Sequence, residues 1–225
     1  MVLGRWRSWW WDVLLLASLA LFTWMVALGW FDRLDLAVRA WCVDHDPAWA
    51  RRIAIILNHL GQGWVLTYVL TGGLTAIALI MTRSWRVVLP GIAAFILTYV
   101  GAGPLKVWTH RDAPSSLLPP EVSVQMFNDA ATTYALSYPS GHIVNTMVWW
   151  PAIVVLLGVV LPRPLPRGWR RFFLGWIPVI VFCTTVYLSY HWVTDDVAAV
   201  ILGLFLARCF WRIPWERLVP APATS

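Results

Sequence analysis

Charged residues are scarce in this chain of 225 amino acids: Asp, Glu, Lys and Arg together make up 12%, whereas 60% of the residues are hydrophobic. A soluble domain of this length carries about twice as much charge. Cysteine is scarce too, with three residues that lie far apart in the sequence. Three scattered cysteines build neither a disulfide framework nor a four-cysteine zinc site. The composition therefore indicates a protein that lies largely within a membrane.

Long apolar runs take the place of the missing charge. A helix needs about 20 apolar residues to cross a bilayer, and backbone in hydrocarbon has to satisfy its own hydrogen bonds. No run shows the alternation of a barrel strand. We therefore predict an all-α integral membrane protein, a single domain over residues 1–225 that forms a six-transmembrane-helix bundle. The predicted spans are residues 13–31, 63–81, 87–105, 143–161, 172–190 and 192–211.

The positions of the basic residues predict the orientation, because cytoplasmic loops carry an excess of Lys and Arg. With a cytoplasmic N-terminus, 11 of the 17 basic residues fall inside, beginning with Arg5 and Arg7. We expect a multi-pass protein of the inner cell membrane with both termini in the cytoplasm. The formal charge of +6 is then a topology signal and does not indicate a nucleic-acid partner. A cleaved signal peptide is the alternative for the first span, although its length favours an uncleaved anchor.

Four ionisable residues stand at the same end of the predicted spans. Lys106 ends the third span, His142 opens the fourth, His191 closes the fifth and Asp195 opens the sixth. Ionisable groups at membrane depth are rare and usually functional. The predicted topology brings all four to the extracytoplasmic side, although they come from distant parts of the sequence. We therefore expect an active site there.

The residues around these four suit phosphate chemistry. Ser140 and Gly141 precede His142 at a predicted helix start, where free amide hydrogens and the helix dipole attract an anion. His142 can give a proton to a leaving alkoxide. The spacing of four places His191 and Asp195 on one helical face if that turn is helical, and a carboxylate on one imidazole nitrogen makes the other more nucleophilic. Lys106 and Arg111 supply positive charge.

The ordered set of Lys106, the tetrad Pro139–His142 and His191-x3-Asp195 resembles the three signature blocks of the type 2 phosphatidic acid phosphatase superfamily. The resemblance covers the chain from about Gly63 to Trp211. It implies six membrane helices with an outward-facing site, and hydrolysis of a phosphoric ester or diphosphate of a lipid without metal or other cofactor. Polyprenyl diphosphate and phosphatidic acid are examples of such substrates. The bilayer and the lipid phosphate are then the expected partners, with the oligomeric state left open.

The resemblance also implies a role for each matching residue. His191 is the nucleophile that forms a phosphohistidine, Asp195 orients it, and His142 protonates the leaving oxygen. The phosphate ligands are Lys106, Ser140, the amide of Gly141 and Arg111.

Two arginines of the family pattern are replaced, by Ala113 in the first block and Thr185 in the third. Threonine cannot supply the bidentate charge of a guanidinium. Three consequences are open: weak affinity for a dianionic monoester, a substrate with less charge at phosphorus, or lost activity. Two further functions therefore compete with the hydrolase, namely a phosphotransferase on the same scaffold and a non-catalytic lipid-binding membrane protein.

Overall fold

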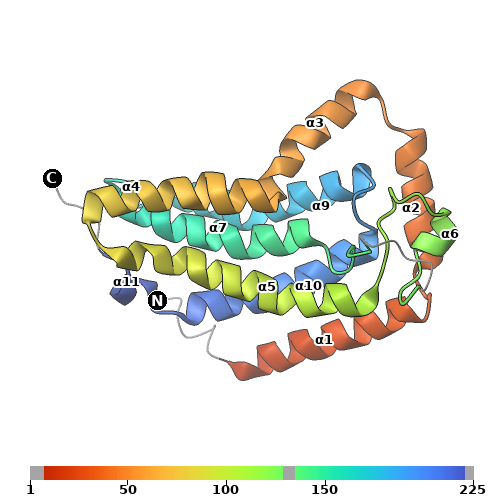
Figure 1. The fold of residues 1–225 in the computed structure, drawn as a ribbon, viewed down its shortest axis with the longest axis horizontal. Coiled ribbons are helices and arrows are strands. Elements are labelled where there is room, and N and C mark those ends of the chain that lie inside the picture. The colour runs from red at the N-terminus through yellow and green to blue at the C-terminus, as the bar shows by residue number, and fades with distance from the viewer. Residues whose placement is uncertain (1–7, 129–134, 221–225) are drawn as a thin grey trace.

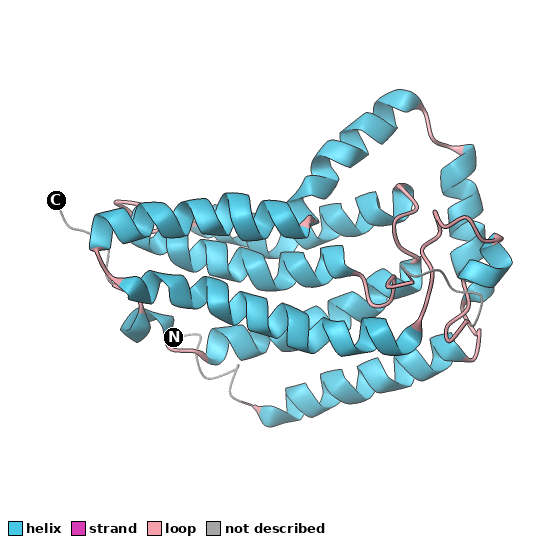
Figure 2. Cartoon of the chain, in the orientation of Figure 1, coloured by secondary structure: helices cyan, strands magenta, loops and turns pink. Residues whose placement is uncertain are grey.

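A computed structural model describes residues 8–128 and 135–220, and every regular element within them is a helix (Figure 2). Arg5 and Arg7, used above for the orientation, lie outside the described residues. Five helical stretches are long and apolar enough to cross a membrane: Trp9–Ala27, Val65–Thr82, Trp85–Thr109, Gly141–Val160 and Arg167–Tyr187. They correspond to α1 (Trp9–Ala27), η3 with α4 (Val65–Gly72, Gly73–Thr82), η4 with α5 (Trp85–Val88, Leu89–Thr109), α7 (Gly141–Val160), and α8 with η5 and α9 (Arg167–Arg171, Phe172–Trp176, Ile177–Tyr187).

The sixth predicted span is the helix α10 (Val193–Arg212), which is as long as the others but carries four charged residues. Asp195 and Asp196 lie in its first turn, and Arg208 and Arg212 lie near its other end. Because of these charges, α10 is not among the five stretches that are apolar enough to cross a membrane. The helix nevertheless lies within the bundle, because it packs against both α7 and α1. That α10 crosses the membrane remains a prediction.

The helix α7 is the centre of the bundle. It contacts α4, α5, α9 and α10, and 67% of its apolar window is buried, compared with 22% or less for the other four spans. Apolar residues point in all directions from α7, which is the pattern of a helix that is surrounded by others. The long helices run side by side around it (Figure 1). Whatever stands at the start of α7 is therefore close to several other helix ends.

Short elements cover one end of this bundle. They are α2 (Asp32–Asp44), α3 (Ala48–Asn58), η2 (His59–Gly61) and α6 (Pro120–Ser123). Figure 1 shows α2 and α6 at this end, which we call the α2 end, and α11 (Trp215–Leu218) at the opposite end, which we call the α11 end. The α2 end holds the C-termini of α1, α5 and α9 and the N-termini of α7 and α10.

Two helix boundaries differ from the sequence-based spans for a local reason. The first span was expected to reach Phe31, but α1 ends at Ala27, and Gly29 follows with a φ of +74°. The fifth was expected to reach Tyr190, but α9 ends at Tyr187, and Ser189 has a φ of +56°. A residue in this left-handed region turns the chain out of a helix. The second departure changes the surroundings of His191, as described below.

Candidate active site

The four ionisable residues singled out in the sequence meet at the α2 end of the bundle. Lys106 lies in the last turn of α5, and His142 lies in the first turn of α7. His191 stands in the turn between α9 and α10, and Asp195 lies in the first turn of α10. Three distant parts of the sequence thus contribute to one cluster of polar groups.

The two imidazole rings face each other. Nδ1 of His142 lies 3.2 Å from Nε2 of His191, and the ring planes are inclined by 70°. His191 is buried, with 9% of its surface exposed, whereas His142 is partly exposed. Two nitrogens this close border the same space, so a phosphoryl group that enters and separates them would meet both rings.

The carboxylate of Asp195 holds the far side of the His191 ring. Its Oδ2 lies 3.7 Å from Nδ1 of His191, and it accepts hydrogen bonds from Ser137 Oγ at 2.6 Å and from the backbone amide of Trp192 at 3.0 Å. Ser137 Oγ also lies 3.2 Å from Nδ1 of His191. A proton held on Nδ1 by these oxygens leaves the lone pair on Nε2, the nitrogen that faces His142.

This contact does not arise from a shared helical face. Asp195 is the third residue of α10, whereas His191 precedes the helix, because Ser189 has already turned the chain. The expected helical turn between the two residues is therefore wrong, although the two side chains meet. The Asp195 carboxylate bonds the Trp192 amide as an N-terminal cap does, and this bond fixes the carboxylate beneath the imidazole.

Burial keeps the imidazole of His191 uncharged. The apolar surroundings of His191 lower its pKa below the ordinary value of 6.5, and the nearby Asp195 carboxylate opposes this effect without cancelling it. The ring is therefore neutral at physiological pH, which is the form that can attack phosphorus.

The start of α7 lies directly beside Lys106. Nζ of Lys106 donates hydrogen bonds of 2.6 Å to the carbonyl oxygens of Leu136 and Pro139. A Cβ atom built on Gly141 would lie 3.7 Å from Nζ, so the ammonium group stands next to the first residue of the helix. Ser140 is the N-cap of α7, with its Oγ 3.5 Å from the amide of Ile143. Ammonium, hydroxyl and helix N-terminus form one positive corner.

Arg111 is placed differently from the other predicted phosphate ligands. Its side chain is completely buried and donates to Asp195 Oδ1 at 2.7 Å and to Asp35 Oδ2 at 2.8 Å. It also donates to Thr194 Oγ1 and to the carbonyl of Val124. Among residues 8–128 and 135–220, the link from Arg111 to His191 runs through Asp195. The guanidinium therefore holds Asp195 from the side opposite the imidazole.

The position of the replaced third-block arginine is occupied by a hydroxyl bound to an acid. Thr185 is fully buried, and its Oγ1 donates a 2.5 Å hydrogen bond to Oδ2 of Asp196. Asp196 is fully buried as well and lies beside Ser140. The positive corner at Lys106 and Ser140 thus has a carboxyl group beside it, and the position at which the family pattern has an arginine holds a threonine that binds this carboxyl group.

An apolar groove runs between α1 and α5 close to this site. It has a volume of about 330 Å³. Leu105, which precedes Lys106, lines it, and so does Thr23, whose Oγ1 lies 2.7 Å from the hydroxyl of Tyr138. The remaining lining residues are Leu16, Leu19, Ala20, Trp24, Ala27, Trp108 and Phe127. The groove thus ends against the loop that carries Ser137 and Ser140.

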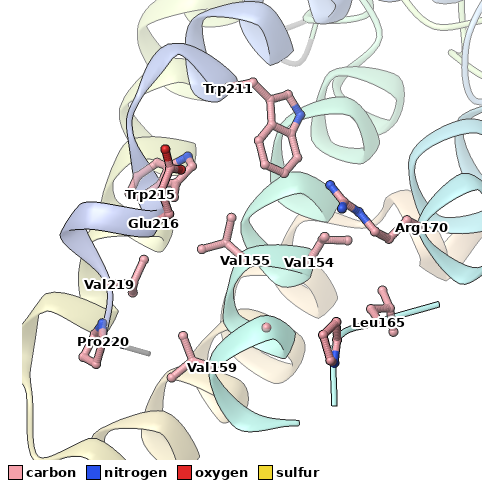
Figure 3. Close-up of a pocket in the computed structure, with 12 residues that line it drawn as sticks. Val154, Val155, Val159, Leu165, Arg170, Trp211, Trp215, Glu216, Val219 and Pro220 are labelled. Carbon is pink, nitrogen blue, oxygen red and sulfur yellow. The ribbon is translucent and has the colours of Figure 1, made fainter. Parts of the chain in front are cut away.

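A second pocket, of about 440 Å³, lies at the α11 end, as Figure 3 shows. Trp211, Trp215 and Val155 give it an apolar lining, and Arg170 and Glu216 stand at its border. None of the predicted site residues lines it. It is therefore separate from the histidine pair.

Several residues of the site could not be found by spacing. Asp35 lies about 160 positions before Thr194 in the sequence, yet its Oδ1 accepts from the amide of Thr194 at 3.1 Å. Ser137 stands just before the tetrad and looks like an ordinary loop serine. Asp196 directly follows Asp195, and nothing in the sequence marks it as a partner of Thr185. Among residues 8–128 and 135–220, no group of three or more His, Cys, Asp or Glu side chains could hold a metal ion.

Comparison with known proteins agrees with this architecture. The chain resembles the crystal structure of the first transmembrane PAP2 type phosphatidylglycerolphosphate phosphatase from Bacillus subtilis, with a TM-score of 0.70 and 22% sequence identity. The match covers 91% of this chain and 96% of the other, and it supports the fold, an all-helical membrane bundle. None of the curated proteins compared with the chain matches it. The model of the PAP2 superfamily matches residues 87–218, more than half of the sequence, and the chain therefore belongs to that superfamily.

Proposed function

We propose that this protein is a membrane lipid phosphatase that hydrolyses a phosphoric ester or diphosphate of a lipid through a phosphohistidine. The single observation that carries the proposal is the 3.2 Å approach of His142 Nδ1 to His191 Nε2, with Asp195 on the far nitrogen of His191. One ring is thereby prepared as a nucleophile, and the other stands where a leaving oxygen needs a proton.

The reaction then has two steps. Nε2 of His191 attacks phosphorus, the bond from phosphorus to the leaving oxygen breaks, and His142 gives that oxygen a proton. The leaving oxygen is the lipid alkoxide of an ester, or an oxygen of the phosphate that stays on the lipid of a diphosphate. In the second step His142 takes a proton from water, whose oxygen attacks the phosphohistidine and releases phosphate. Lys106, Ser140 and the amide of Gly141 bind the phosphoryl oxygens and stabilise the charge that develops on them.

Asp195 keeps His191 in the productive tautomer during both steps. Arg111 acts indirectly, because it contacts Asp195. We assign Arg111 the role of a positioning residue, because its guanidinium is bound to Asp195 and Asp35 and not exposed to the site. A guanidinium is costly to bury alone, and the two carboxylates around Arg111 compensate its charge and keep it in place.

The groove between α1 and α5 is the proposed seat of the lipid chain. Its lining is apolar, it borders Lys106 through Leu105, and it touches the catalytic loop through the bond between Thr23 and Tyr138. A phosphate at the histidine pair would leave its hydrocarbon beside this groove, where burial of each methylene group is favourable.

The membrane arrangement follows from the same proposal. We infer that α10 is the sixth span, that both termini are cytoplasmic in the inner cell membrane, and that the α2 end faces outward. Arg83, Arg86 and Arg167 then lie on the cytoplasmic side, as the excess of basic residues in inner loops requires.

The test uses the purified full-length protein in detergent with a chelator present. A panel of lipid phosphates and lipid diphosphates is assayed for phosphate release, and the protein is quenched within milliseconds to trap phosphohistidine. We expect His191→Ala to lose release by several orders of magnitude and to form no phosphoenzyme. His45→Ala removes an exposed imidazole that bonds the Trp41 carbonyl and stacks on the Trp41 ring, away from the histidine pair, so it is the matched control.

Phosphate release that survives in His191→Ala would overturn the assigned nucleophile. A wild-type protein without turnover or phosphoenzyme on the whole panel would favour the non-catalytic lipid-binding alternative. Transfer of the phosphoryl group to an added alcohol in preference to water would favour the phosphotransferase.

A further inference from the structure

One acidic group beside the phosphate-binding corner has no role in the proposed mechanism. Asp196 is completely buried in the first turn of α10. Its Oδ2 accepts the 2.5 Å hydrogen bond from Thr185, and its side chain lies beside Ser140, a proposed ligand of the phosphoryl group. A carboxyl group at this place is in contact with the region where phosphoryl oxygens have to bind.

The second oxygen of this carboxyl group is unsatisfied. Oδ1 of Asp196 is buried and has no hydrogen-bond partner within residues 8–128 and 135–220. Buried polar atoms in folded proteins almost always have a partner, and an exception calls for an explanation such as a ligand. The missing partner is a donor when the group is ionised, and it is an acceptor when the group carries a proton on Oδ1.

The charges around Asp196 do not neutralise it. It interacts with one ammonium group, Lys106 of α5, and with the neighbouring carboxylate of Asp195. The guanidinium of Arg111 is already bound to Asp195 and Asp35. A doubly charged phosphate and an ionised Asp196 would therefore place more negative charge in this corner than its basic groups compensate, unless a proton enters with them.

Two acidic groups that share a small buried space are stable only when a proton lies between them. We propose that Asp196 is a specificity-determining residue that shares one proton with the bound phosphoryl group, so that the site selects phosphoric groups with a single negative charge. These are a protonated monoester, which brings the proton to Oδ1, or a phosphodiester, which accepts it from the carboxyl group.

This inference rests on the proposed function, because it takes Ser140 and Lys106 as the phosphate ligands. It names the substrate class of that site and accounts for the replacement of a third-block guanidinium. An arginine at position 185 would supply the second positive charge that a dianion needs. Thr185 instead fixes the orientation of the Asp196 carboxyl group.

The test measures binding of inorganic phosphate to the full-length protein by calorimetry between pH 7.5 and 9, where free phosphate is the dianion. Binding that takes up one proton weakens about tenfold for each rise of one pH unit. We expect this slope in the wild type and its loss in Asp196→Asn, whose amide can donate directly to the dianion. At the upper end of the range the variant should bind phosphate at least about tenfold more tightly.

Asp44→Asn is the matched control, because Asp44 is an exposed acid at the end of α2 and should leave the slope unchanged. Asp196→Ala is a second variant that cannot share a proton, and it covers the case in which the amide disturbs folding. Turnover provides an independent readout: the kcat/KM ratio of phosphodiester to monoester should fall about tenfold in Asp196→Asn, as the linkage predicts.

Equal pH slopes in wild type and in both Asp196 variants would overturn the inference and leave the proposed phosphatase intact. Failure of the proposed phosphatase is a separate result, since it is the absence of phosphoenzyme and turnover in the wild type. Phosphate binding is measured without turnover, so the two outcomes are distinguishable.

Discussion

Ser137 donates a hydrogen bond of 2.6 Å to Oδ2 of Asp195, and the same hydroxyl lies 3.2 Å from Nδ1 of His191. The carboxylate and the imidazole are themselves 3.7 Å apart, so the hydroxyl connects two groups that are slightly too distant for a direct bond. Ser137 comes from the loop before α7, whereas Asp195 belongs to α10. The orientation of the proposed nucleophile thus depends on a residue outside the signature blocks.

Replacing Ser137 by alanine should slow catalysis without preventing folding. A hydrogen bond to a charged group contributes about 1.5–3 kcal/mol, which corresponds to a fall in kcat of about tenfold to a hundredfold. KM should change little, because Ser137 is not a proposed phosphate ligand. Steady-state kinetics on one lipid phosphate would check this, and Ser137→Thr, which retains the hydroxyl, should recover part of the rate. A fall in Ser137→Ala that appears only in KM would contradict the positioning role.

The buried ion pairs of Arg111 predict a loss of stability. Arg111→Met leaves Asp35 and Asp195 without their common partner, and breaking a buried pair costs about 3–5 kcal/mol. We expect a clearly lower midpoint of thermal unfolding in detergent together with weak activity. Arg51→Met is the control, because Arg51 pairs with Asp46 at the surface, where such a pair contributes about 0–1 kcal/mol. Similar midpoints for the two variants would show that the buried cluster does not hold this end of the bundle together.

The pH dependence of the first chemical step follows from the surroundings of His191. Burial lowers the pKa of His191, so the ring stays neutral and nucleophilic as the pH falls below 6.5, and the attack slows only when the pH passes through the lowered value. Rapid-quench measurement of phosphohistidine formation at saturating substrate isolates this step from binding. The acidic limb should have its midpoint below 6.5, and a midpoint above 6.5 would contradict the effect of burial.

How far the sequence predicts this molecule depends on the range of the interactions. The spans follow from composition alone, because a bilayer requires about 20 apolar residues whatever their order. Five of the predicted spans correspond to helices that are long and apolar enough to cross a membrane, and the sixth corresponds to α10, whose crossing stays a prediction. The differences at the ends of α1 and α9 come from single backbone angles at Gly29 and Ser189. Such angles leave no clear pattern in the apolar runs.

The residues of the candidate site also fall into those that the sequence predicts and those that it does not. Lys106, His142, His191 and Asp195 stand at helix ends, so topology alone brings them to one level. Their support does not follow from topology: the contact of Asp35 with Thr194 joins α2 to α10 across most of the chain. The surroundings of Arg111 do not follow from its position either, because that position fits a phosphate ligand whereas the structure places two carboxylates around the guanidinium.

The groove between α1 and α5 predicts which substrates respond to a mutation far from the histidines. Ala20 lines this groove and is exposed in it, so Ala20→Trp should fill part of the space that the lipid chain needs. If two methylene groups are displaced, at about 0.8 kcal/mol each, KM for a long-chain lipid phosphate should rise about tenfold. A water-soluble aryl phosphate has no chain, and its KM and kcat should stay unchanged.

Ala76 provides the matched control for Ala20. It is an equally small, exposed residue that lines a different apolar groove, between α4 and α5, bordered by Leu79 and Val88 near the α11 end. Because that groove is remote from the histidine pair, Ala76→Trp should leave both substrates unaffected. An equal rise of KM for the long-chain lipid in both variants would indicate a general effect of tryptophan on the bundle. A rise for the aryl phosphate in Ala20→Trp would mean that the mutation disturbs the catalytic loop through Thr23 and Tyr138, and the groove would then lose its proposed role as the seat of the chain.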